Sequence, residues 1–181
     1  MKKIVLITAI ASILGTAGMA QAASNGTITF NGELTANTCD VAIDGQSADA
    51  TVVLPTVGTN QLDTAAKTAG ETGFMIGLNG CAGVLNTASA FFEPGASVDS
   101  VTGRLKNMNG TATNVSLQLV DASSPSKTVI QAGSQNQVTA TTYKDVSSGS
   151  VSLPYNVRYY AEGPASAGTV VSNVVYSIQY Q

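Results

Sequence analysis

Short runs in which apolar and polar residues alternate make up most of this chain, and Gly, Asn, Ser and Pro separate them. Alternation with a period of two places one face of a run in a core and the other in water, so it predicts β-strands. Many short strands with turns of this kind indicate one all-β domain built as a sandwich. We expect strands over residues 28–34, 50–54, 74–79, 90–92, 101–106, 115–120, 128–130, 151–161 and 170–180.

Two segments modify this pattern. Residues 62–69 could form two helical turns, but Gly70 and Gly73 follow at once, so we expect a loop or a short helix there. Pro154 lies near the start of the strand predicted over 151–161. Because proline has no N–H for a ladder hydrogen bond, that end is predicted to lie at a sheet edge or a bulge.

The first residues have the composition of a secretory signal peptide. Lys2 and Lys3 precede an apolar stretch over 4–19, and Ala20-Gln21-Ala22 is an A-x-A cleavage site. We expect residues 1–22 to be removed and the rest to be exported. The apolar stretch is short and no second one follows, so insertion of the exported chain into a membrane is not expected.

Strand-like patterns lie at both ends of the exported chain. Near the start, GTITFNGELTANTC (26–39) alternates and either pairs within its own sheet or adds to the sheet of another molecule. At the other end, Val174, Tyr176, Ile178 and Tyr180 share one face. Glu162 is the only charged residue between Ala161 and Gln181. Natural proteins normally block such an apolar edge, so pairing with a partner is predicted at this edge.

Composition argues against several classes of function. Removing 22 of the 181 residues leaves 159, enough for one domain, with six basic and eleven acidic residues and a net charge of −5. This charge disfavours nucleic acid and anionic membrane surfaces as partners. The chain has no His and no paired acid–base constellation, so we expect no enzyme, no catalytic residue, no metal and no cofactor.

Cys39 and Cys81 are the two cysteines. An even number of cysteines in an exported chain predicts a disulfide and an oxidising compartment. A metal site would need further ligands and a nucleophilic thiol would need a base, and without His both alternatives are weak.

Four sequence blocks point to one family. They are FNGEL (30–34) with Cys39 five residues later, FMIGLNGC (74–81), LPYNVRYYA (153–161) and YSIQYQ (176–181). In this order, and with the cysteine spacing and the signal peptide, the exported chain resembles the chaperone–usher pilins over nearly its whole length. The resemblance is to major subunits of type 1-like fimbriae in particular.

The resemblance implies an incomplete immunoglobulin-like β-sandwich that lacks its final strand and is completed by donor-strand exchange. A periplasmic chaperone fills the resulting groove until, at an outer-membrane usher, the N-terminal extension of an identical subunit replaces it. Repetition gives an extracellular fimbria on a Gram-negative-type cell surface, which mediates cell adhesion and biofilm formation. Such head-to-tail contacts do not close, so they yield a filament.

The resemblance also implies roles for segments and residues. They are a signal peptide (1–22), a donor-strand extension (23–37) and a pilin domain (38–181). The donor residues are Ile28, Phe30, Gly32 and Leu34, with Gly32 where the acceptor groove is too shallow for a side chain. The acceptor wall comprises Val174, Tyr176, Ile178 and Tyr180, and the chaperone would grip the carboxylate of Gln181. Only residues 23–29 precede Phe30, so either the donor strand is short or cleavage occurs elsewhere.

Two alternatives stay open. Asn31-Gly32 is by local rules a hairpin signal, which would make residues 28–34 a turn within the subunit rather than a donor strand. The chain could also be a minor or adaptor subunit of the fibre or its tip with a receptor-binding role, although its length leaves no room for an additional lectin domain.

Overall fold

The computed structural model describes residues 27–32, 34 and 38–181. The predicted signal peptide lies outside the described residues, as do residues 23–26, 33 and 35–37 of the predicted extension. The chain divides into two units, residues 1–33 and 34–181. In the first unit, the described residues form neither strand nor turn.

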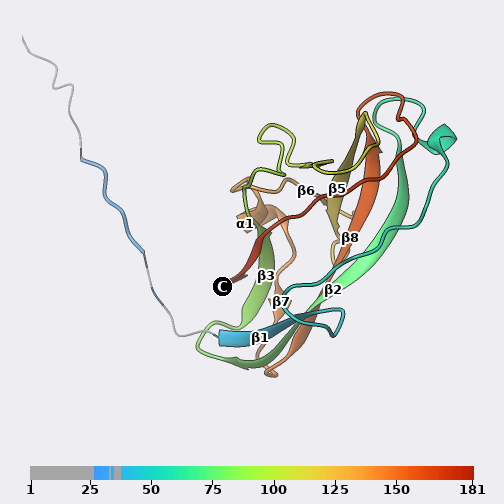
Figure 1. The fold of residues 1–181 in the computed structure, drawn as a ribbon. Helices are drawn as coiled ribbons and strands as arrows, with labels where there is room; N and C mark the ends of the chain where they lie inside the picture. Colours follow the sequence, from blue (N-terminus) through green and yellow to red (C-terminus); the bar gives the residue numbers. More distant parts are fainter. Residues whose placement is uncertain (1–26, 33, 35–37) are drawn as a thin grey trace, which may run out of the picture. The chain divides into compact units, whose positions relative to one another are not determined.

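The second unit is built from two antiparallel sheets (Figure 1). The larger sheet has the order β1-β2-β8-β5-β4, with β6 also paired to β5, and the smaller has the order β7-β3-β9. The larger sheet comprises β1 (Thr38–Ile43), β2 (Thr68–Ala82), β4 (Leu105–Lys106), β5 (Val115–Asp121), β6 (Val129–Ile130) and β8 (Val151–Ala161). The smaller comprises β3 (Thr87–Phe92), β7 (Lys144–Asp145) and β9 (Tyr176–Tyr180). A 3-10 turn, η1 (Thr59–Gln61), and one helical turn, α1 (Gln137–Ala140), complete the described elements.

The hydrophobic core lies between the two sheets. Tyr155 on β8 sits at its centre, because its ring packs on Phe92 at 5.2 Å between centroids and on Phe74 at 5.8 Å. Its hydroxyl accepts a hydrogen bond from the main-chain N–H of Ala90, so the buried phenol is satisfied. The larger sheet also contributes Ile76, Leu78, Leu117, Leu119, Leu153 and Val157, and the smaller contributes Ala88 and Ala90.

Most predicted strands form, and the all-β prediction is confirmed. β8 covers the residues predicted for it, the runs 74–79, 90–92 and 115–120 fall within β2, β3 and β5, and β6 covers all but the first residue of 128–130. Pro154 pairs with Met75 of β2, whereas the ladder with β5 begins one residue later, at Tyr155. β8 is therefore a central strand, and its proline lies one residue outside the part of it that pairs with β5. Residues 62–69 contain no helix: they form turns that lead into β2.

Three predicted strands are wrong in extent. Of 101–106, only β4 forms, because Asp99 Oδ1 accepts hydrogen bonds from the main chain of Val101 and Thr102 and holds residues 99–104 in a tight turn. Of 170–180, only β9 forms a ladder. Residues 50–54 are extended but pair with no described strand.

The predicted disulfide is confirmed. Cys39 on β1 bonds to Cys81 on β2, and the sequence separation is 42 residues. The two strands are also neighbours in the ladder, so the bond fastens the edge strand β1 to the sheet.

Replacing both cysteines with alanine should lower the free energy of unfolding by about 4 kcal/mol, because the unfolded chain regains the entropy of a loop of this length. Urea denaturation of the exported chain, compared with the oxidised wild type, measures this loss. A loss below about 1 kcal/mol would contradict a structural role for the bond.

A charged cluster lies on the larger sheet. Glu71 on β2 accepts hydrogen bonds from Lys127 at 2.7 Å and from Asn156 at 2.7 Å, and Arg158 lies 3.3 Å from its second oxygen. The hydrogen bond from Lys127 is the main cause that holds the pKa of Glu71 below its ordinary value. The cluster links β2 and β8 to the loop before β6.

Because the pKa of Glu71 is lower in the folded chain, its stabilisation exists above its ordinary pKa and disappears as pH falls through the folded pKa. We expect Glu71→Gln to destabilise the chain by less than about 1 kcal/mol at pH 7, as for partly exposed ion pairs. The difference from wild type in urea midpoint should shrink towards zero as the pH falls below the ordinary pKa of a glutamate and through the folded pKa of Glu71. A difference that stays the same from neutral to acidic pH would exclude this ion pair as its cause.

Candidate functional site

A long open groove runs over the core of the second unit. Two cavities of about 430 Å³ and about 450 Å³ make up its two halves. The same three parts of the chain line both cavities in consecutive stretches, so the halves are continuous. These parts are the inner face of the larger sheet, the segment 48–57 and the segment 165–176.

The floor of the groove is apolar. Phe74, Ile76, Leu117, Leu119 and Val157 lie under one half. Val115, Tyr159 and Leu62 lie under the other half. Most of these side chains are buried members of the core, and Phe74 and Tyr159 are half-buried, so the floor of the groove is the surface of the core itself. Burial raises the pKa of Tyr159, so its hydroxyl stays protonated at neutral pH.

The first wall is the segment 50–57. Its side chains alternate: Val52 and Leu54 are half-buried against the core, and Val53 between them is exposed. The main chain is extended, yet none of its N–H or C=O groups forms a hydrogen bond to another described residue. This wall is therefore a strand edge without a neighbour.

The second wall, residues 169–175, is bonded on its outer side alone. The main chain of Val171 bonds to Met108 N and to Asn107 Oδ1, Ser97 Oγ donates to Asn173 O, and Glu93 N donates to Val175 O. These are all odd-numbered positions, and in an extended chain the intervening residues direct their N–H and C=O groups the opposite way. The main-chain groups of Val170, Ser172 and Val174 have no partner among the described residues.

One buried side-chain atom in the second wall is also without a hydrogen-bond partner among the described residues. This atom is Ser172 Oγ, and Ser172 lines the groove. Buried hydroxyls are normally bonded. Both walls therefore present hydrogen-bonding groups to an empty apolar channel, which is the environment that an added β-strand would satisfy.

The structure divides the four predicted acceptor residues. Val174 and Tyr176 line the groove, and the Tyr176 hydroxyl donates to Ala48 O at 2.8 Å, which joins the two walls at one end. Ile178 is half-buried against the core without lining the groove. Tyr180 lines a separate cavity of about 90 Å³ beside the disulfide. The sequence predicted a strand over 50–54 from its β-branched run, but it gave no indication that the segment 48–57 forms a wall of the groove.

The predicted donor residues are exposed. Ile28, Phe30 and Leu34 show 77%, 88% and 102% of their surface. A Cβ at Gly32 would meet no atom within 4 Å, so nothing within the described chain requires glycine there. Three large apolar side chains in water, at alternate positions, are costly to expose and are the residues that a groove of this chemistry would bury.

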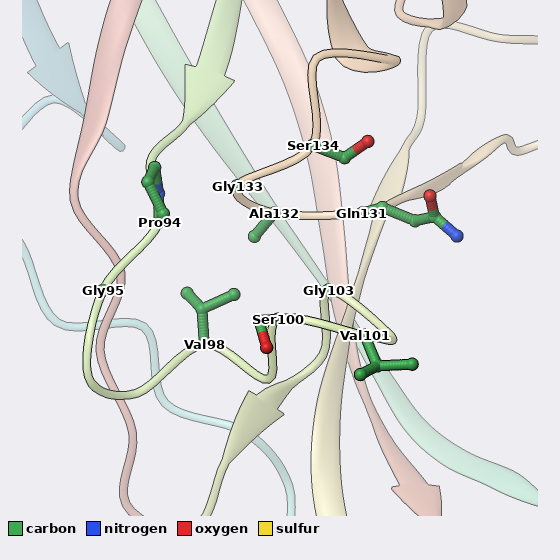
Figure 2. A pocket seen from close by; sticks show the side chains of 10 residues that line it. All are labelled: Pro94, Gly95, Val98, Ser100, Val101, Gly103, Gln131, Ala132, Gly133 and Ser134. Carbon is green, nitrogen blue, oxygen red and sulfur yellow. The ribbon is translucent and has the colours of Figure 1, made fainter.

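Another cavity, of about 240 Å³, lies between two loops (Figure 2). The loops contribute residues 94–103 and 131–134, with Val98 and Ala132 buried beneath and no charged side chain in the lining. The lining therefore contains no carboxylate, imidazole or amine that could act as an acid or a base. Among the described residues, no three His, Cys, Asp or Glu side chains are grouped to hold a metal. No helix in the described part of the chain is long and apolar enough to cross a membrane.

Two antiparallel sheets with an open groove between extended walls define an immunoglobulin-like all-β sandwich of the pilin type. The chain belongs to the fimbrial subunit family described as "FimA: Type-1 fimbrial protein, A", whose sequence pattern matches residues 54–181. The family resemblance found in the sequence is thereby confirmed.

Relatives match along nearly their whole length. The chain is 40% identical to "Major fimbrial subunit SMF-1" of Stenotrophomonas maltophilia (strain K279a), over 93% of this chain and 99% of the relative. It is 39% identical to "F17 fimbrial protein" of Escherichia coli, over 100% of both. The crystal structure of the P pilus rod subunit PapA matches in fold, with a TM-score of 0.60 at 15% identity over 78% of this chain and 99% of that one.

Proposed function

We propose that this fimbrial subunit polymerises by donor-strand exchange, with residues 28–34 of one copy filling the groove of the next. The observation that supports this most directly is the groove itself, an apolar channel between two strand edges whose inward main-chain groups are unpaired. A strand placed there would bond to both walls and cover the floor.

The dimensions and chemistry of the donor segment fit the groove. Seven residues in an extended strand span about 20 Å, close to the length of the eight-residue wall 50–57. Ile28, Phe30, Gly32 and Leu34 share one face, which would point to the groove floor, and Thr29 and Asn31 share the other. Burying each large side chain would contribute about 2 kcal/mol.

The contact is of the head-to-tail kind. The donor segment and the groove are different surfaces of one chain, so each copy uses one of each, and repetition gives a filament rather than a closed oligomer. In this proposal the identical subunit is the main partner.

Export and assembly factors complete the proposal. We expect the chain to cross the periplasm, where a chaperone would occupy the groove, and to be assembled at an outer-membrane usher into an extracellular fimbria. The fibre would serve cell adhesion and biofilm formation. The support for these partners is the family relationship, together with the cost of leaving an apolar groove and unpaired edges in water.

A minor or adaptor subunit is the alternative. The relative whose printed name is a major fimbrial subunit, at 40% identity, favours the major role. Sheared fibres decide between them: a major subunit should be their dominant protein and should give a ladder on SDS gels without boiling. A trace amount of this chain in the fibres would favour the adaptor role.

Phe30→Ala should weaken the contact between subunits by about 2–3 kcal/mol, because it removes the largest apolar side chain of the donor face. The unboiled SDS ladder should shorten, and dissociation into monomers should occur at lower temperature. Thr29→Ala is the matched control on the opposite face and should leave the ladder unchanged. Equal effects of the two changes would contradict a donor face made of even-numbered residues.

Gly32→Phe should block assembly, because the proposal places this position where the floor of the neighbouring groove leaves no space for a side chain. The free subunit should fold normally, since a Cβ at Gly32 meets no atom within 4 Å. Electron microscopy should show no fibres on cells that produce this variant, and none on cells whose subunit lacks residues 23–34. Normal fibres from Gly32→Phe would refute the donor role of this position and favour the hairpin alternative.

A further inference from the structure

The smaller sheet has a second edge, along the side of β3 that faces away from β9. In β3 the odd-numbered residues direct their main-chain groups to β9: Thr87 exchanges two main-chain hydrogen bonds with Gln181, and Ser89 and Phe91 follow at the same spacing in the ladder. The even-numbered residues point the other way, where β7 pairs with Thr87 and Ala88 alone. None of the described strands therefore lies beside the edge from Ala90 to Phe92, although both residues are buried.

A side chain takes the place of the missing strand. Gln137 of α1 accepts a hydrogen bond from Phe92 N at Oε1 (2.9 Å) and donates from Nε2 to Phe92 O (3.0 Å). The side-chain amide thus makes the two bonds that one residue of a neighbouring antiparallel strand would make with its N–H and C=O. Gln137 is 2% exposed, and its Nε2 also donates to Ser134 O at 3.2 Å.

Other contacts hold the same segment, residues 131–146, along the edge. Gly133 N donates to Phe92 O, Thr142 N donates to the buried carboxylate of Asp121 at 2.7 Å, and Val146 N donates to Asn86 O. Thr141 Oγ1 accepts from Ser89 Oγ and donates to Gln137 O. Ala90 N, between the two ends, is bonded by the Tyr155 hydroxyl. Each contact comes from a side chain or a single main-chain group, so the segment covers the edge without forming a long strand.

We propose that Gln137 closes the outer edge of β3 and thereby restricts strand addition to the groove. The excluded partner is a second copy of this chain, pairing through the same edge. Identical edges that pair antiparallel form a two-fold dimer, which closes and cannot grow. Gln137 is in this sense a specificity-determining residue of assembly. The effect of Gln137 on assembly rests on the proposed function, but the closure of the β3 edge can be tested independently of that function.

The test uses the exported chain with Phe30→Asp, a change that places a charge on the donor face and should leave the subunit monomeric. Gln137→Leu in this background keeps the size and apolar surroundings of the side chain and removes all three of its hydrogen bonds. We expect Phe30→Asp/Gln137→Leu to sediment largely as a dimer at tens of micromolar. Hydrogen exchange at Phe92 N should be at least ten-fold faster in its monomeric fraction than in Phe30→Asp alone.

Two further variants separate edge closure from loss of stability. Gln137→Glu loses the donor bonds to Phe92 O and Ser134 O but places a charge on the edge, which blocks strand pairing. We expect it to be less stable than Gln137→Leu and still monomeric. Thr141→Val breaks a neighbouring bond in the same segment and should also stay monomeric. Dimers from all three variants would refute the inference, as would a folded, monomeric Gln137→Leu.

The unmodified chain gives an independent reading. Phe92 N should exchange at the rate of global unfolding, together with the ladder amides of β3, and exchange as fast as in exposed loops would refute the inference. If Phe30→Asp alone still forms fibres, the donor proposal fails, and the exchange rate at Phe92 in wild type and Gln137→Leu then decides the role of Gln137 separately.

Discussion

The structure depends on one unmet requirement: main-chain hydrogen-bonding groups that face an apolar channel need partners. Residues 50–57 and the even-numbered residues of 169–175 are extended and lie against the core, but no described strand lies between them. Water in the groove can bond these groups, whereas an added strand would bond them and at the same time bury its own apolar side chains against the apolar lining. The fold is thus a sandwich whose core and ladder are incomplete at the same place.

The walls keep their shape because they are held from outside the groove. The side chain of Asn107 bonds to Thr169 O and Val171 N, and Ser97 and Glu93 bond further along the same wall. Tyr176 links the two walls at one end. A channel that is held open in this way costs little further ordering when a strand enters, which favours tight addition. The irregular segment 107–112 therefore has a clear role, as an external support for one wall.

Much of the sandwich could be predicted from the sequence because burial on a pleated face leaves a period of two, as in Val115, Leu117 and Leu119 of β5. The same pattern predicted strands over 50–54 and 170–175, where the structure has extended chain without a ladder. The pattern records which side chains meet the core, and it carries no information on whether a neighbouring strand belongs to the same molecule. Gln137 and the turn at Asp99 were missed because polar residues in loops have no period, and the bond of Gln137 to Phe92 joins residues 45 positions apart in the sequence.

An open strand edge can pair with another molecule. The edge at β3 is covered, whereas the edges at the groove are left without a neighbouring strand. A subunit with two open edges could grow in two ways, and an isologous pairing at β3 would end a chain that grows through the groove. The outer side of β3 is covered by the segment 131–146, which contributes two ladder residues and the side-chain amide of Gln137, and the Tyr155 hydroxyl of β8 bonds to Ala90 N. Single groups can take the place of a strand there because a polar group on the edge needs one partner and not a whole strand. The groove differs because it is a long channel over the apolar core, and single side chains cannot fill a channel of this length. Under the proposed donor-strand exchange, a covered edge at β3 and an open groove would make assembly directional.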